Sequence, residues 1–357
     1  MKSPLSALLL GLAVVASTLL HAQSPGLDEE ARVWVESTFE EMSLDEKIGQ
    51  LIIGGADSDF TNLRSDKFQK IRDDITRYHV GGYHAFGGEL LSAALLIQRM
   101  QELASVPLLI TADLEGGAGL IFRGGTRFPK AMALAATFDP ESARRVGRMT
   151  ALEAQSIGVN INFYPVVDVN NNPLNPIINI RSFGEDPQQV SRMAVAYIEG
   201  FQENGLIATA KHFPGHGDTS TDSHLQLPVI RVSRERLEQV ELVPFRGAIR
   251  AGVGAVMTAH LVIPVLESGP AVPATLSERI STDLLKREMG FDGLVVTDAM
   301  NMGGLRHHYG DAEAAVRAFS AGADLILFPS SIQKAFVGLR EALRQGRISG
   351  SRLDRSV

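Results

Sequence analysis

The strongest constraint on the fold is a repeated alternation of short apolar runs with longer segments of mixed polarity. Eight apolar runs follow one another along the chain, at residues 51–55, 81–86, 108–112, 159–166, 206–210, 255–259, 294–297 and 324–328. Eight helix-length segments separate or follow them, at residues 66–78, 90–103, 140–157, 187–203, 234–251, 278–288, 311–321 and 332–344. Strands that alternate with helices form parallel β-α-β units, so eight repeats predict an α/β protein with a (β/α)8 TIM-type barrel. A doubly wound open sheet is the alternative.

Titratable residues recur at the ends of successive apolar runs. Asp113 follows the third run, Asp168 the fourth, His260 the sixth and Asp298 the seventh. In a barrel, the carboxyl ends of all the strands meet at one face, where the loops build the active site. An open sheet would concentrate such groups at one switch point instead. The distribution favours the barrel, and since no linker-like stretch divides the chain, we expect a single domain.

The densest group of reactive side chains lies in residues 206–224, LIATAKHFPGHGDTSTDSH. Its apolar start passes directly into a loop that is punctuated by a proline and two glycines. The loop carries a lysine, three histidines and two aspartates, namely Lys211, His212, His216, Asp218, Asp222 and His224. A loop made only for solubility would use Lys, Glu and Ser rather than imidazoles that titrate near neutral pH. We therefore expect this loop to take part in catalysis or ligand binding.

Asp298 and the pair Asp222–His224 are candidates for the cleavage of a glycosidic bond. An aspartate at the mouth of a barrel can attack the anomeric carbon of a sugar. The alternative is that Asp298 caps the helix that follows. An imidazolium at His224 can protonate the leaving oxygen while Asp222 orients the ring. The alternative for this pair is that Asp222 caps a turn and His224 packs against it.

Four further residues are candidates for holding sugar hydroxyls: Asp113, Arg181, Lys211 and His212. Hydroxyls both donate and accept hydrogen bonds, so a sugar site needs charged acceptors and charged donors together. The alternative for Arg181 is a purely structural ion pair with Glu185 or Asp186.

A metal hydrolase is a weaker interpretation of the histidines, because Pro214 and the glycines exclude a helical His-x-x-x-His pair.

Composition narrows the class and the location of the protein. A net charge of −7 leaves no basic footprint for nucleic acid, and the absence of cysteine excludes disulfides and thiolate chemistry. Residues 1–22 are predicted to be a secretory signal peptide, because Lys2 precedes an apolar stretch that ends before polar residues. An uncleaved membrane anchor is the alternative. We expect residues 23–357 to be secreted or periplasmic, without stable membrane insertion.

The end of the chain has two interpretations. Residues 351–357 read as the start of a further helix that is too short to dock against the rest of the domain. The chain is then either a fragment, with a further domain missing, or a barrel whose last helix is short. The sequence does not indicate the oligomeric state.

Five motifs together resemble glycoside hydrolase family 3, and specifically its β-N-acetylhexosaminidase branch. They occur in the family's order and are DLEGG at 113–117, NIRSFG at 179–184, KHFPGHG at 211–217, DSH at 222–224 and TDAM at 297–300. The resemblance implies a barrel domain over residues 23–357, with Asp298 as nucleophile and His224 as acid/base, oriented by Asp222. It also implies that Asp113, Arg181, Lys211 and His212 bind the terminal sugar, in a retaining reaction without metal or cofactor.

The implied substrate is a β-linked N-acetylglucosaminide, from peptidoglycan fragments or chitin-type oligosaccharides. Two features depart from the pattern. The arginine that commonly follows the Gly-Gly pair is replaced by residues 118–122, AGLIF, and the apparent export signal differs from cytoplasmic recycling enzymes. A β-glucosidase, β-xylosidase or glycoside phosphorylase of the same family is the main alternative function. A sugar-binding protein without catalysis is the second.

Overall fold

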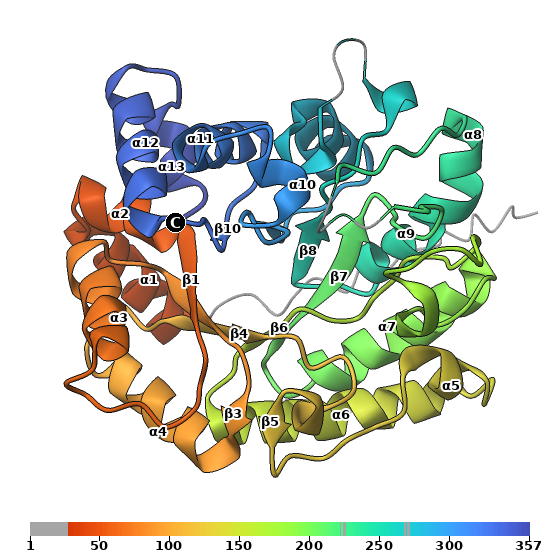
Figure 1. Ribbon diagram of the computed structural model, residues 1–357, viewed down its shortest axis with the longest axis horizontal. Helices are drawn as coiled ribbons and strands as arrows, with labels where there is room; N and C mark the ends of the chain where they lie inside the picture. The colour runs from red at the N-terminus through yellow and green to blue at the C-terminus, as the bar shows by residue number, and fades with distance from the viewer. Residues whose placement is uncertain (1–27, 222, 224–225, 268, 270–271) are drawn as a thin grey trace, which may run out of the picture.

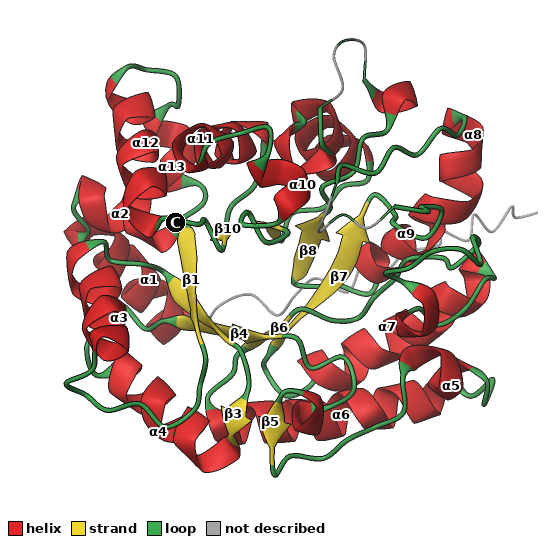
Figure 2. Ribbon diagram, viewed as in Figure 1, coloured by secondary structure: helices red, strands yellow, loops and turns green. Residues whose placement is uncertain are grey.

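The structure is a closed barrel of eight parallel strands surrounded by helices (Figures 1 and 2). It is a computed structural model and describes residues 28–221, 223, 226–267, 269 and 272–357. The barrel strands are β1 (Ile52–Ala56), β2 (Gly82–Ala85), β4 (Leu109–Ala112), β6 (Ile161–Asn162), β7 (Ile207–Phe213), β8 (Ala255–Thr258), β9 (Leu294–Thr297) and β10 (Ile326–Leu327). Their order is β10-β1-β2-β4-β6-β7-β8-β9. The predicted signal peptide lies outside the described residues.

The two end strands of that order also meet. A parallel bridge joins Val296 to Leu325, and the Thr297 N–H donates to the Leu325 carbonyl at 3.0 Å. The sheet therefore closes on itself, which confirms the predicted barrel and contradicts the open-sheet alternative. Each of the eight predicted apolar runs overlaps one of these strands, although β1 and β7 extend beyond their runs.

Helices occupy all eight predicted helical segments and form the outer layer (Figure 2). They are α3 (Asp66–Arg77), α4 (Leu90–Gln101), α6 (Pro140–Ile157), α7 (Pro187–Gln202), the composite of α8 (Arg234–Arg236), η3 (Leu237–Glu241) and α9 (Leu242–Arg250), η6 (Arg279–Glu288), α11 (Asp311–Ala321) and α12 (Ile332–Arg344). Local signals explain several boundaries. Before α2 (Leu44–Gln50), Ser43 and Glu46 form a reciprocal capping box, while Gly158 ends α6 in a left-handed conformation.

Apolar residues form two cores with different roles. The larger core fills the layer between the strands and the surrounding helices. A smaller core fills the barrel interior and consists of Ile53, Ile161, Phe163, Met257, Val296, Leu325 and Leu327. Because the interior is packed with side chains, the barrel has no open channel, and its carboxyl-terminal face presents a solid floor for a binding site.

The two ends of the described chain differ in how they pack. α1 (Glu29–Glu41) has no buried residue, and Trp34 is 51% exposed. α13 (Gly350–Asp354) was expected to be too short to dock, and this is wrong. Leu353 is buried, and the Arg352 guanidinium donates to Asp324 and to the Ala323 carbonyl. No helix in the described part of the chain is long and apolar enough to span a bilayer.

Candidate active site

A bulge in β7 brings two consecutive side chains, those of Lys211 and His212, to the barrel mouth. Lys211 pairs with Met257 of β8, whereas the next residue paired with β8 is Phe213, so His212 is the extra residue. In a regular strand, consecutive side chains point to opposite faces, and a bulge re-aims one of them. Lys211 and His212 therefore line the same cavity, and both are buried.

Lys211 belongs to a network of four charged groups at the ends of three segments. Its ammonium lies 2.6 Å from Asp113 and 2.9 Å from Glu115, both of which follow β4. The Arg181 guanidinium donates two hydrogen bonds to Glu115, at 2.9 and 2.7 Å, in bidentate geometry. Asp113 is the most exposed member, with 39% of its side chain accessible. The network thus has two buried members, Lys211 and Glu115, and one carboxylate, Asp113, that reaches into the cavity.

The charges in this network keep one another ionised. Burial opposes ionisation of Glu115, but the charges of Lys211 and Arg181 outweigh it and hold the pKa of Glu115 well below its usual range. Burial also opposes the charge of Lys211, and here Asp113 and Glu115 outweigh it, so the pKa of Lys211 is raised. The site therefore presents a fixed ammonium and a fixed guanidinium as donors, next to carboxylate acceptors.

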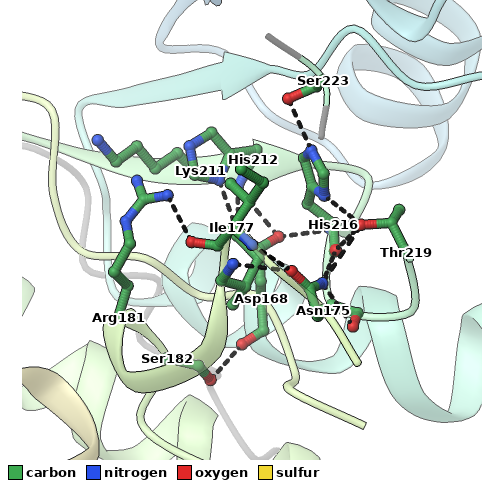
Figure 3. A network of polar contacts seen from close by, with 12 residues as sticks. Asp168, Asn175, Ile177, Arg181, Ser182, Lys211, His212, His216, Thr219 and Ser223 are labelled. Atoms are coloured by element: carbon green, nitrogen blue, oxygen red, sulfur yellow. Dashed lines mark hydrogen bonds and ion pairs between the residues drawn. The ribbon is translucent and has the colours of Figure 1, made fainter. Parts of the chain in front are cut away.

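A second buried carboxylate, Asp168, anchors the loop that follows β7 (Figure 3). Asp168 is fully buried and accepts hydrogen bonds from the His212 ring at 2.7 Å and from the backbone N–H of His216 at 2.7 Å. Burial raises the pKa of Asp168, but its contacts with His212 and His216 outweigh this and leave it lowered. Because the Nδ1 atom of His212 is held by Asp168, the opposite edge of the ring is directed to the cavity.

The His216 ring connects this anchor to Ser223. Its Nδ1 lies 2.9 Å from the Thr219 hydroxyl, and its Nε2 lies 3.0 Å from the Ser223 hydroxyl (Figure 3). The side-chain amide of Asn175 donates to the carbonyls of His216 and Gly217 at 2.8 and 2.9 Å. Position 217 has no room for a residue other than glycine, because a Cβ atom would lie 1.6 Å from the Val169 carbonyl oxygen. The loop is therefore packed closely against the segment after β6.

Asp298 lies directly after β9 at the cavity wall. Its Oδ1 accepts a hydrogen bond from the Ala299 N–H at 2.8 Å, and the following helix, α10 (Gly303–Arg306), is capped at Met302. The helix-cap alternative for Asp298 is therefore wrong. Burial raises the pKa of Asp298, but His212, His260, the Ala299 N–H and Lys211 outweigh it, so the pKa is lowered and the carboxylate is ionised at neutral pH.

These groups surround a cavity of about 440 Å³ at the carboxyl-terminal face of the barrel. One wall carries the charged groups described above. The adjoining wall is aromatic, because His84, Phe86 and Phe328 lie together with ring centroids 4.5 to 5.7 Å apart. His84 also stacks on Phe163 of the floor, with its ring plane 7° from parallel, and its Nε2 lies 3.4 Å from Asp113 of the charged wall. A polar wall beside an aromatic one suits a ligand that has both hydroxyl groups and an apolar ring face.

Five of the seven residues predicted for the site are brought together in this cavity: Asp113, Arg181, Lys211, His212 and Asp298. The other two, Asp222 and His224, lie outside the described residues. The alternative for Arg181, an ion pair with Glu185 or Asp186, is wrong, because Glu115 pairs with Arg181 instead. Within the described ranges, no group of three or more His, Asp or Glu side chains is placed to bind a metal ion.

Sequence reasoning did not assign roles to Glu115, Asp168 or His84. Glu115 stands two residues after Asp113 at the same strand end, and this signal was available. Asp168 was noticed only as a polar residue after the fourth run. Nothing in the sequence around His84 distinguishes it from a core histidine.

Comparison with known proteins identifies relatives of the chain. Residues 43–357 match the glycosyl hydrolase family 3 N-terminal domain. The chain is 38% identical over 347 residues to a β-N-acetylglucosaminidase/β-glucosidase of Cellulomonas fimi, covering 95% of this chain and 60% of that protein. It is 32% identical to a β-hexosaminidase of Nitrosospira multiformis, covering 80% of this chain and 82% of that protein.

A solved structure of a family 3 enzyme also superposes on this chain. A family 3 β-N-acetylglucosaminidase from Paenibacillus sp. FPU-7 superposes with a TM-score of 0.81 at 41% identity, over 88% of this chain and 61% of that one. The chain thus spans about 60% of the length of the Cellulomonas and Paenibacillus proteins that it matches.

We predict that His84 makes stability depend on pH. Burial and the nearby Lys211 lower the pKa of His84 to about 4, although Asp113 opposes this shift. Between pH 6.5 and 4 the unfolded chain binds a proton at this residue and the folded chain does not, so folding stability falls as the pH falls. The expected loss from pH 7 to pH 5 is about 2 kcal/mol for this one group.

Urea unfolding at pH 7 and pH 5 measures this effect. His84→Gln should reduce the difference between the two free energies of unfolding by about 2 kcal/mol. The exposed residue His308 provides the matched control, and His308→Gln should leave the difference as in the parent chain. Equal pH dependence in His84→Gln and the parent chain would contradict the prediction.

Proposed function

The chain belongs to glycosyl hydrolase family 3, and we propose that it is a retaining, exo-acting β-N-acetylhexosaminidase. The substrate is a terminal β-linked N-acetylglucosamine on a peptidoglycan fragment or a chitin-type oligosaccharide. The observation that carries this proposal is the ionised Asp298 in a cavity whose other walls hold fixed donors and acceptors for hydroxyl groups. Relatives named as β-N-acetylglucosaminidase and β-hexosaminidase support the choice of sugar.

The residues of the cavity divide between binding and chemistry. Asp113 accepts from sugar hydroxyls, and Lys211 and Arg181 donate to them, because their contacts with one another and with Glu115 already orient these side chains. His212 presents its free ring edge, since Asp168 holds the other nitrogen. The aromatic wall formed by Phe86 and Phe328 covers the apolar face of the sugar ring. Glu115 and Asp168 act on the sugar only through the groups that they position.

Catalysis takes two steps in this proposal. The Asp298 carboxylate attacks the anomeric carbon, the glycosidic C–O bond breaks, and the leaving oxygen takes a proton from the His224 imidazolium. A covalent glycosyl ester of Asp298 results. The neutral His224 then removes a proton from water, whose oxygen attacks the same carbon and releases Asp298. Asp222 orients His224. The roles of these two residues rest on the resemblance of the DSH motif, since both lie outside the described residues.

We further propose that the protein acts after export, in the periplasm or outside the cell. Support comes from residues 1–22, whose charge and apolar pattern is that of a secretory signal. This location suits substrates derived from cell walls or chitin. A second candidate activity is β-glucosidase, because the Cellulomonas relative carries both activities in its name.

The proposed activity predicts a preference for the N-acetylated sugar. We expect faster release of nitrophenol from the β-N-acetylglucosaminide than from the β-glucoside when the two are assayed side by side. The same assays with and without phosphate separate hydrolysis from phosphorolysis, since phosphate accelerates only the latter. Preference for the glucoside would contradict the proposed sugar, and turnover of neither would favour a binding protein without catalysis.

The nucleophile assignment predicts that Asp298→Ala lowers kcat by at least about 10³-fold. The loss should leave the fold intact, because the Asp298 side chain makes a local hydrogen bond to the adjacent N–H. Urea unfolding checks the fold and nitrophenol release checks the rate. Glu288→Ala, an exposed surface change, serves as the control. Residual activity within about tenfold of the parent chain would overturn the assignment.

The acid role of His224 predicts a dependence on the leaving group. His224→Ala should lower the rate by about 10² to 10³-fold with an oligosaccharide, whose leaving alkoxide needs a proton. With a dinitrophenyl glycoside the first step needs no proton, so the rate of the initial burst should fall by less than about tenfold. Equal losses with both substrates would argue against proton donation by His224.

A further inference from the structure

We call the cavity that holds Asp113, Lys211 and Asp298 the sugar cavity, after its proposed ligand. A second cavity of about 640 Å³ adjoins it at the rim of the barrel. It lies between α3 on one side and the segment from β10 to the first turn of α12 on the other. Gly54 and Gly55 of β1 lie at its base. We call it the lateral groove. Asn301 and Phe328 line both cavities, so the lateral groove begins where the sugar cavity ends.

Phe328 forms the boundary between the two cavities. Its backbone is in the left-handed region, with φ 55°, which is uncommon for a bulky residue and is found mainly at functional sites. Its ring lies against Gly55, where a Cβ atom would come within 1.8 Å of the Phe328 ring. The glycine in β1 therefore makes room for an aromatic wall that faces both cavities.

The barrel topology determines the direction in which a bound sugar projects its leaving group. Around the barrel, β4, β6 and β7 lie opposite β9, β10 and β1. Asp113 and Arg181 follow β4 and β6 of the first group and Lys211 lies within β7, whereas Asp298 follows β9 of the second group. The anomeric carbon and C4 of a pyranose lie at opposite ends of the ring. A sugar whose far end contacts the first group therefore directs its anomeric bond toward β9, β10 and β1, where the lateral groove opens.

The side chains that line the lateral groove are suited to hydroxyl and amide groups. They include the carboxylate of Asp66, the guanidinium of Arg77 and the amides of Asn301 and Gln333. Among the residues that the structure describes, none of these four side chains has a hydrogen bond or an ion pair with another. Asp66, Arg77, Asn301 and Gln333 are all exposed. Unengaged donors and acceptors along a groove match the alternating hydroxyl and acetamido groups of an oligosaccharide.

We propose that the lateral groove binds the saccharide part of the leaving group, so that the preferred substrate is an oligosaccharide rather than a simple glycoside. This inference rests on the proposed function, because it takes the orientation of the terminal sugar from it. It predicts that sugar units beyond the cleaved bond add to affinity through contacts with α3 and α12.

Binding measurements test the inference apart from turnover. In the Asp298→Ala background, calorimetry compares the affinity for N,N′,N″-triacetylchitotriose with that for N-acetylglucosamine alone. Adding Arg77→Ala or Gln333→Ala should weaken binding of the trisaccharide by about three- to tenfold each, as expected for the loss of one or two hydrogen bonds. The ratio of trisaccharide to monosaccharide affinity should fall by the same factor.

Two matched substitutions serve as controls. Arg72→Ala on α3 and Gln345→Ala after α12 change the same residue types outside the lateral groove, and should leave the affinity ratio as in the Asp298→Ala chain. Ser330→Trp, at an exposed position on the groove wall, should obstruct the trisaccharide more strongly than either alanine change.

The outcomes separate the two proposals. If the parent chain cleaves the aryl N-acetylglucosaminide, but the groove substitutions alter trisaccharide binding no more than the controls do, the lateral groove is not the leaving-group site. If the parent chain cleaves no glycoside, the proposed function fails. Trisaccharide binding that depends on Arg77 and Gln333 would then still assign the lateral groove to a saccharide, whereas its absence would overturn that assignment as well.

Discussion

The ion pairing of the buried Lys211 ammonium with Asp113 and Glu115 holds the mouth of the barrel together. A charge removed from water is costly unless nearby opposite charges and hydrogen bonds compensate it. Lys211 is compensated by Asp113 and Glu115, and Glu115 in turn holds Arg181 in a bidentate pair. One cation therefore joins the ends of β4 and β7 with the 3₁₀ turn at Asn179–Arg181. Loss of any member would leave a buried charge without one of its partners.

The same burial divides the titratable groups into two classes. Glu115, Asp168 and Asp298 have lowered pKa values because cations, rings or N–H groups face them. His84 and His216 have pKa values near 4, chiefly because of burial. At neutral pH the cavity thus combines ionised carboxylates with neutral buried imidazoles. An ionised Asp298 is the state in which a carboxylate can attack an anomeric carbon.

A closed barrel also explains why the two cavities lie where they do. Opposite strands of the ring present side chains to one another across the mouth, so the groups proposed to hold a sugar and the carboxylate proposed to attack it come from opposite sides. The packed interior, with Phe163 and Met257 as floor, prevents a ligand from passing into the barrel. A bound chain must therefore extend outward from the mouth, and the lateral groove between α3 and α12 offers one path along the rim.

Local sequence patterns were sufficient to predict the barrel and most of the candidate residues of its site. Apolar runs and helical segments are local patterns, so all eight repeats could be recognised, and Asp113, Lys211, His212 and Asp298 could be selected because each stands at the end of a run. Tertiary structure decided the partners. Glu115 pairs with Arg181 across 66 residues, and Asp168 holds His212 across 44, and no local periodicity reports such contacts. The bulge at His212 and the lateral groove likewise arise only when the barrel closes, because closure sets the register of β7 against β8 and brings α3 beside α12.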